Sequence, residues 1–391
     1  MNRSKIRMLG FIFLLFIVSP IIGKAEAGET IKLGMSTALS GPSRDLGQSM
    51  SLGVKTYIDR VNRAGGVNQR KIELIIMDDG YQANAALKNA KKLLDQGVVA
   101  MIGNVGTPTA KLTEPFSNKH KIVFFAPYSG ANLLRDYSVS PFTFNFRASY
   151  SEEMEVIIGR IFEQGVEPRR VSFFIQDDAY GNAGLAAAND ALVKRGFNNI
   201  SDLEVFRYSR NTNDVSQALK ALLKMKIKPL AIILVGTYGP SSKFINYSST
   251  LLPNTLFFNL SFVGAHTLSK NLDVNSNKIF ITQVVPSIGS DITATKELRE
   301  QLAKRNKSSM YNSITLEGYV AAKILVNALE KMKGEVDGVR LRNSLESGAV
   351  FDVGLGHSMM FTPEEHQASH KVWLLQYDRK NQFIDIDGGN R

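Results

Sequence analysis

Small and hydroxylated residues gather in three loops, each of which follows a short apolar run and precedes an amphipathic stretch. The loops read STALSGPSRDLGQS, GNVGTPTAKL and APYSGANLLRD, and they contain Ser40, Thr107, Ser129 and Gly130. The first two loops lead into expected helices, where free backbone N–H groups and a hydroxyl suit an anion such as a carboxylate, and the third offers exposed backbone at Ser129 and Gly130. Taken singly, each loop is equally well explained as a tight turn. Together they predict one site for a small carboxylate.

Other kinds of site chemistry are poorly represented. Paired acids follow two expected strands, in MDDG and QDDA, where they can hold a metal, act as acid and base, or cap the next helix. His366 and His370 have a metal-like spacing, but they stand in a polar connection where solvated side chains are the better interpretation. No nucleophile–base pair and no nucleotide-binding motif is evident. We therefore expect a binding protein and not an enzyme, with no metal and no cofactor.

Composition limits the class of protein further. The 391 residues include no cysteine and carry a formal net charge of +11. The lack of cysteine excludes a disulfide framework, a thiolate metal site and a lipid-modified cysteine. Lysines and arginines are interleaved with acids along expected helices, so we interpret them as solvated helix faces and expect no nucleic acid partner.

The N-terminal residues have the pattern of a secretion signal. A basic start precedes an apolar run from Leu9 to Val18, and Ala25 and Ala27 supply the small residues that a signal peptidase reads. The run is shorter than the roughly 20 residues that span a bilayer. The pattern predicts cleavage near Ala27 and an exported protein, with residues 1–27 removed. A retained N-terminal anchor is the alternative.

The remaining chain alternates short β-branched runs with amphipathic stretches, which is typical of parallel sheets covered on both faces. The pattern pauses near residues 142–148 and restarts, so we predict an α/β fold with two Rossmann-like lobes. The helical block after residue 286 is expected to return to lobe one, and a terminal hairpin over 372–386 to join lobe two. The predicted lobes are residues 28–145 plus 287–355, and residues 146–286 plus 356–391. Three hinge crossovers are expected, at Phe142–Ala148, Val284–Ser287 and Gly354–Met360. The predicted elements include helices at 83–95 and 265–271 and strands at 171–176 and 256–259.

Several motifs, in this order and spacing, resemble the periplasmic leucine-binding protein family, the branched-chain amino acid receptors of ABC transporters. They are LGMSTALSGP, VNRAGGVNQRKIEL, IGNVGTPT, FAPYSGANLL and QDDAYGNAGL. The resemblance covers essentially all of the chain after the expected signal. It implies a type I periplasmic binding fold, closure of the two lobes around a ligand, and a monomer.

The resemblance also implies roles for single residues. Thr107 falls where a hydroxyl binds the ligand carboxylate. Tyr128 and Gly130 fall where the following loop contacts carboxylate and ammonium. Tyr180 and Tyr238 match aromatic residues of the second lobe that cover the ligand on closure.

Two positions depart from the family pattern. Leu46 stands where leucine-binding proteins carry a tyrosine, and Ser261 falls where an acidic residue usually pairs with the ligand ammonium. An unpaired buried ion costs several kcal/mol. Either Asp45 or Asp178 replaces the acid, or the ligand has no ammonium, or the alignment slips by one residue. The expected ligand-binding residues are Ser40, Thr107, Tyr128, Ser129, Gly130, Tyr180, Tyr238 and Ser261.

Arg147 lies in the first expected crossover, in FNFRASYSEE. Its guanidinium could clamp a carboxylate through two hydrogen bonds. The favoured interpretation is that Arg147 pairs with Glu152 or Glu153 and braces the hinge.

These patterns lead to one functional expectation and two alternatives. We expect the periplasmic receptor of an ABC transporter, which binds an amino acid or a related small carboxylate or amide and docks on a permease in the inner membrane. One alternative is a periplasmic sensor subunit that presents its ligand to a membrane receptor. The other is a secreted α/β enzyme that uses an acid pair such as Asp78 and Asp79.

Overall fold

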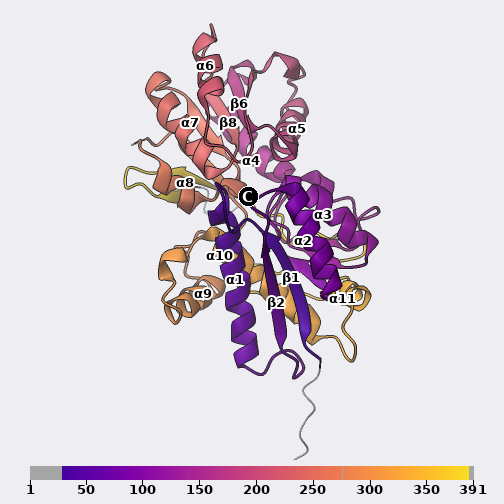
Figure 1. Ribbon diagram of the computed structural model, residues 1–391. Helices are drawn as coiled ribbons and strands as arrows, with labels where there is room; N and C mark the ends of the chain where they lie inside the picture. Colours follow the sequence, from indigo (N-terminus) through magenta and orange to yellow (C-terminus); the bar gives the residue numbers. More distant parts are fainter. Residues whose placement is uncertain (1–28, 275, 387–391) are drawn as a thin grey trace, which may run out of the picture.

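The computed structural model describes residues 29–274 and 276–386, so the predicted secretion signal lies outside the described residues. The chain forms two lobes, one above the other in Figure 1, and the predicted α/β architecture is confirmed. Within the described ranges, no helix combines the length and apolar character needed to cross a membrane.

The lower lobe in Figure 1 is built on a five-stranded parallel sheet. Its strands are β1 (Ile31–Thr37), β2 (Ile72–Asp78), β3 (Ala100–Ile102), β4 (Val123–Phe125) and β5 (Thr143–Phe144). Their order across the sheet is β2-β1-β3-β4-β5. The pairing of Phe124 with Thr143 adds β5 to the edge. With only two residues, β5 is too short to show a strand pattern in the sequence.

Helices cover both faces of this sheet. They are α1 (Arg44–Arg63), α2 (Ala83–Asp95), α3 (Thr107–Lys119), η1 (Asn132–Leu134), α9 (Thr293–Ala303), η5 (Ser308–Met310), α10 (Ser313–Glu330) and α11 (Gly338–Leu345). Helices α1 and α10 pack closely although they lie far apart in the sequence. A Cβ atom on Gly53 of α1 would stand 2.1 Å from the Thr315 carbonyl oxygen, and one on Gly318 of α10 would stand 2.4 Å from the Met50 carbonyl oxygen. The two glycines thus permit this approach.

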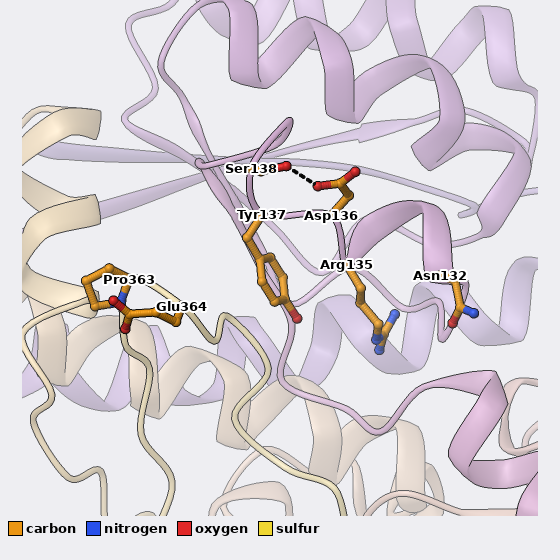
Figure 2. Close-up of a pocket in the computed structure, with 7 residues that line it drawn as sticks. All are labelled: Asn132, Arg135, Asp136, Tyr137, Ser138, Pro363 and Glu364. Atoms are coloured by element: carbon orange, nitrogen blue, oxygen red, sulfur yellow. Dashed lines mark hydrogen bonds between the residues drawn. The ribbon is translucent and has the colours of Figure 1, made fainter.

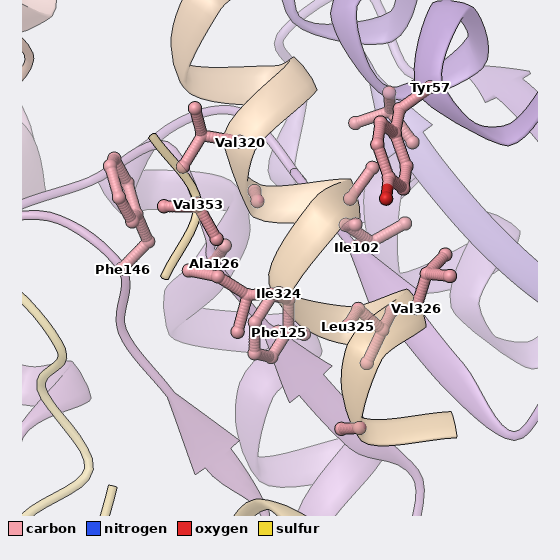
Figure 3. Packing of buried hydrophobic residues seen from close by; sticks show 14 of the residues in the cluster. Tyr57, Ile102, Phe125, Ala126, Phe146, Val320, Ile324, Leu325, Val326 and Val353 are labelled. Atoms are coloured by element: carbon pink, nitrogen blue, oxygen red, sulfur yellow. The ribbon is translucent and has the colours of Figure 1, made fainter. Parts of the chain in front are cut away.

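The core between the sheet and α10 shows that the late helices belong to this lobe. Figure 3 shows Ile324 of α10 close to Phe125, and Val320 belongs to the same buried cluster, as do Tyr57 of α1 and Ile102 of β3. All five side chains are buried. Because α10 supplies one side of this core, the first lobe is complete only after most of the second lobe has been synthesised.

The second lobe is built on a seven-stranded sheet. Its strands are β6 (Val171–Gln176), β7 (Val205–Tyr208), β8 (Ala231–Val235), β9 (Leu256–Asn259), β10 (Ile279–Gln283), β11 (Trp373–Tyr377) and β12 (Phe383–Asp385). Its helices are α4 (Tyr150–Glu163), η2 (Pro168–Arg170), α5 (Ala179–Lys194), η3 (Ile200–Asp202), α6 (Ser216–Lys224), α7 (Tyr238–Leu251), η4 (Ser261–Val263) and α8 (Ala265–Asn271). Strands β6 to β10 are parallel, whereas β11 and β12 form the predicted terminal hairpin, in which β11 is antiparallel to both β10 and β12.

Three segments pass between the lobes and pack together. Ala148, Val284 and Val372 come from one passage each and form a small buried cluster. The third passage runs through Val372, later in the chain than residues 354–360, because Met359 is buried in the core of the first lobe. The residue boundaries of the two lobes stay a prediction.

Polar side chains also join the passages. Gln367 Nε2 donates to Glu152 Oε2 over 2.8 Å, and His370 Nδ1 lies 2.6 Å from Glu152 Oε1. Arg135 donates to the Arg147 carbonyl oxygen and to Gln367 Oε1. Burial alone would raise the pKa of Glu152, but hydrogen bonds from His370 and its other partners lower that pKa to about 2.

The His370–Glu152 contact predicts a pH-dependent contribution to stability. Its hydrogen bond raises the pKa of His370, so the contribution is complete below the unfolded-state pKa of about 6.5 and disappears as the pH rises through the folded-state value. Because His370 is 57% exposed, we expect less than about 1 kcal/mol. His370→Asn should therefore lower Tm at about pH 5.5 and leave it nearly unchanged at about pH 8.5.

Thermal unfolding followed by circular dichroism at both pH values tests this prediction. His120→Asn, at the exposed end of α3, is the control because its ring packs on Phe116 of the same helix. A loss of Tm in His370→Asn that is equal at the two pH values would contradict the argument.

Candidate functional site

Three of the expected ligand-binding residues lie in the first turns of helices. Helix α3 begins at Thr107, α5 one residue before Tyr180, and α7 at Tyr238, each earlier than the sequence pattern predicts. Asp178 explains the early start of α5, because its carboxylate accepts a 2.9 Å hydrogen bond from the Tyr180 backbone N–H. Helix N-termini carry partial positive charge, so these positions suit an anionic ligand group.

The first lobe contributes a buried pair of hydroxyls. Thr107 Oγ1 and Ser129 Oγ lie 2.8 Å apart, and both side chains are fully buried. Gly130 follows directly and packs against Tyr150, the first residue of α4, where a Cβ atom would stand 2.5 Å from the ring. Only glycine allows this close approach, which brings Tyr150 beside the hydroxyl pair.

Contacts across the cleft hold the lobes together in this structure. The Tyr128 hydroxyl donates to the Ser261 carbonyl oxygen over 3.2 Å, and the Asp45 backbone N–H donates to the Tyr238 hydroxyl over 3.4 Å. Tyr128 is 1% exposed and Ser261 is 7% exposed. A solute can therefore reach these groups only when the lobes separate.

Aromatic rings fill the centre of the cleft. The Phe262 ring centroid lies 5.2 Å from that of Tyr128, 4.4 Å from that of Tyr180 and 6.3 Å from that of Tyr81. Tyr150 adds a further ring, 5.6 Å from Tyr180. The sequence analysis missed Tyr81, Tyr150 and Phe262. Tyr81 follows the carboxyl end of β2, so the rule that selected the other strand-end loops would have found it.

A buried cluster of charges lies at the hinge end of the cleft. Arg147 Nη2 lies 3.9 Å from Glu153 Oε1, and Arg147 Nε lies 3.6 Å from Glu317 Oε1. Glu153 also accepts hydrogen bonds from the Ser261 backbone N–H and Oγ, over 2.8 and 2.9 Å. Burial raises the pKa of Glu317 to about 7, against the lowering effect of Arg147. Arg147 is thus paired with Glu153, one of the two partners that the sequence analysis expected, and also with Glu317.

Two of the expected ligand-binding residues lie apart from the others. Ser40 is exposed, and its backbone N–H donates to Asp78 Oδ1 over 3.3 Å. Tyr238 lies at the edge of the cleft, in contact with the backbone of Asp45. The contacts described above bring the other six close together: Thr107, Tyr128, Ser129, Gly130, Tyr180 and Ser261. Their role in binding stays a prediction.

Neither of the acids considered as replacements at position 261 is free. The Asp45 side chain is 41% exposed and lies 3.7 Å from Arg44. Asp178 caps α5 and also accepts a 2.7 Å hydrogen bond from Gln176 Nε2. An ammonium at Ser261 would therefore find neither of these carboxylates as a ready partner.

The paired acids after β2 are engaged in holding their own loops. Asp78 accepts hydrogen bonds from the backbone N–H groups of Leu39 and Gly80. Asp79 accepts hydrogen bonds from Ser36 Oγ and from the backbone N–H of its second neighbour along the chain. Burial raises the pKa of Asp79 to about 6. Both acids therefore stabilise the conformation of their own loops.

The histidine pair is split between two environments. His366 is 1% exposed and its ring nitrogens lie 2.9 Å from the Thr143 carbonyl oxygen and 3.0 Å from Glu346 Oε1. The solvated loop expected there is thus partly buried, because His366 stacks on Phe144. Across the described parts of the chain, no group of three or more acids and histidines could hold a metal ion.

A surface pocket beside the hinge is shown in Figure 2. Its lining includes Arg135 and Tyr137, with Glu364 on the opposite loop. The guanidinium of Arg135 is already bonded to the passages between the lobes, and Ser138 Oγ donates to Asp136 Oδ1. These side chains are engaged in local structure, so the cleft is the better candidate site.

Two lobes joined by three passages, with helix N-termini and hydroxyls facing a closed cleft, define a class of proteins that enclose a small solute. The family model described as "Periplasmic binding protein" matches residues 30–382. The chain belongs to this family, and the resemblance seen in the motifs is confirmed.

Individual relatives agree with the family. A crystal structure of a possible leucine/isoleucine/valine-binding protein from Rhodopirellula baltica is 34% identical, with a TM-score of 0.87, over 93% of this chain and 98% of that one. The Leu/Ile/Val-binding protein homolog 7 of Brucella abortus is 22% identical over 86% of this chain and 85% of its own. A fatty acid ABC transporter substrate-binding protein from Thermomonospora curvata shares the fold, with 23% identity and a TM-score of 0.80 over 92% of this chain and 91% of that one.

Proposed function

We propose that this protein is the solute receptor of an ABC transporter in the periplasm, and that it encloses an amino acid or a related small carboxylate. Contacts across the cleft support this proposal most directly, because the Tyr128 hydroxyl of one lobe reaches the Ser261 carbonyl of the other. A solute held by Thr107, Ser129 and Gly130 on one side and by Tyr180 on the other would bridge the two lobes.

Hinge closure provides the mechanism. A ligand that contacts both lobes binds the closed state better than the open one, and it shifts the population towards closure by that difference in affinity. The three passages are thin and lie side by side, packed through Ala148, Val284 and Val372, so they can bend together. The closed monomer would then dock on a permease in the inner membrane. The names of the relatives support the proposal. They mention both ligands that carry an amino group and ligands that lack one.

The double variant Thr107→Ala, Tyr180→Ala should lose solute binding and keep its fold. The variant removes one hydroxyl beside Ser129 and one ring beside Phe262. A hydrogen bond to a charged group contributes about 1.5–3 kcal/mol, so we expect the affinity to fall by about 100-fold or more.

Isothermal titration on protein unfolded and refolded to remove bound solute measures this affinity. Tyr247→Ala on the outer face of α7 is the control, because Tyr247 is 56% exposed. Unchanged affinity in the double variant would reject this site, and an altered solute after long incubation would indicate an enzyme.

A further inference from the structure

The guanidinium of Arg147 is buried at the hinge end of the cleft with most of its hydrogen bonds unmade. The side chain is 1% exposed, and a guanidinium has five N–H donors. Nη2 donates to Ser261 Oγ, whereas Nε and Nη1 have no hydrogen-bond partner in the described part of the chain. A buried donor without a partner costs about 1–3 kcal/mol, and more when it is charged. These donors are therefore available to a ligand.

The neighbouring carboxylates do not use these donors. Glu317 Oε1 is 3.6 Å from Nε, and Glu153 Oε1 is 3.9 Å from Nη2, so both contacts are ionic without being hydrogen bonds. Glu153 is turned towards the second lobe, where it accepts hydrogen bonds from Ser261 and Thr282. The acids balance the charge of Arg147 and leave its donors open.

Arg147 packs on the Tyr128 ring and interacts electrostatically with a second buried donor, the hydroxyl of Tyr150. Its guanidinium carbon is 4.5 Å from the centre of the Tyr128 ring. The Tyr150 hydroxyl, which is buried, makes no hydrogen bond of normal geometry with the described residues. Burial raises the pKa of Tyr150, while Arg147 and the nearby Thr107 hydroxyl act in the opposite direction. Cation and hydroxyl together offer donors to an acceptor, which is the chemistry of carboxylate binding.

An ammonium group finds a poorer environment here. A ligand ammonium that paired with Glu317 or Glu153 would lie next to the guanidinium of Arg147, since both carboxylates are less than 4 Å from that guanidinium. Like charges at such distances repel each other, most strongly where water is excluded. When Glu317 is protonated, Arg147 and Glu153 balance each other, and the open N–H donors of Arg147 favour an anionic group over a cationic one.

We propose that Arg147 is a ligand-binding residue, and that the ligand is a small carboxylate without an amino group. The carboxylate would bind Arg147 and the Tyr150 hydroxyl, and the apolar body would lie against Tyr81, Tyr180 and Phe262. This inference rests on the proposed function. When both acids are ionised, Arg147, Glu153 and Glu317 carry a net charge of −1. Because burial raises the pKa of Glu317 to about 7, one proton on Glu317 makes the cluster neutral and lets a carboxylate join.

Ligands of matched shape distinguish the binding of a carboxylate without an amino group from the binding of an amino acid. The panel contains isocaproate, leucine and isocaproamide, and also benzoate and benzamide, added to the mature protein after it has been unfolded and refolded to remove bound solute. A ligand at 100 times its Kd adds about 2.7 kcal/mol, which raises Tm by several degrees. We expect carboxylates to raise Tm, and leucine and the amides to leave it unchanged.

Variants test the role of Arg147 itself. Arg147→Met should weaken carboxylate binding by about 10- to 100-fold, and Arg147→Lys, which keeps the charge, should weaken it less. Tyr150→Phe covers the case in which Arg147→Met fails to fold, because it removes a single hydroxyl whose contacts are with the hydroxyls of Thr107 and Ser129. It should weaken carboxylate binding about tenfold, whereas Tyr377→Phe in the distant hairpin should not.

The outcomes distinguish this inference from the proposed function. Binding of leucine without binding of the amine-free acids would overturn the inference and leave the solute receptor in place. Equal carboxylate affinity in Tyr150→Phe and in the folded Arg147 variants would also overturn it. If no compound binds, and mass spectrometry finds no solute released from the protein as purified, both proposals fail.

Discussion

Gly53→Ala should lower the free energy of unfolding of the first lobe by more than the addition of one methyl group usually does. The added Cβ would stand 2.1 Å from the Thr315 carbonyl oxygen and 2.7 Å from the Tyr319 nitrogen, both backbone atoms of α10. Backbone atoms cannot rotate away as a side chain can, so α1 and α10 must separate. Overpacking typically costs about 1–3 kcal/mol, and we expect this variant at or above the upper end.

Urea unfolding followed by circular dichroism measures the loss. Trp373, the single tryptophan, lies on β11 in the second lobe, so its fluorescence reports that lobe separately. The matched control is Gly159→Ala on α4, where the new Cβ would meet only the end of the Arg195 side chain at 3.5 Å. Alanine is a better helix former than glycine by about 1 kcal/mol, so this control should be slightly stabilised. Equal losses in the two variants would contradict the packing argument.

The alternating fold was predictable from local patterns because each element carries its own signal. The strands at 171–176 and 256–259 and the helix at 83–95 have the bounds that the sequence predicts. Continuous apolar runs mark buried parallel strands, and glycines such as Gly97 mark helix ends. Strand β5 lacked both signals, since its identity depends on pairing with β4 and not on its own two residues.

The candidate site was predictable only where it follows from the edge of a single sheet. Thr107 and Ser129 follow strands that end at one edge, and the structure brings their hydroxyls together. Phe262 and Glu317 gave no such signal, because their contacts form across the cleft and at the hinge, where segments distant in sequence meet. At Asp178 the structure shows a helix cap, which the sequence alone could not distinguish from a ligand partner.

Glu153→Gln is expected to have the second of the two largest effects, because it breaks the buried charge cluster at the hinge. The carboxylate of Glu153 is fully buried and accepts hydrogen bonds from Ser261 and Thr282 while it faces Arg147. A glutamine has one acceptor oxygen in place of two and turns an NH2 group towards donors. Removing one partner of a buried pair costs about 3–5 kcal/mol. We expect the lower end of this range, because Glu317 still faces Arg147.

Glu155→Gln, two residues along the same helix, is the matched control for this substitution. Its carboxylate pairs with Lys194 and Arg195 at the surface and is 33% exposed. Exposed pairs contribute about 0–1 kcal/mol, so urea unfolding should show a loss at least threefold smaller than in Glu153→Gln. Similar losses in the two variants would mean that the buried cluster contributes no more than a surface pair. In that case Arg147 would not be held in place by Glu153, and its donors would have to be positioned by Glu317 and Ser261 alone.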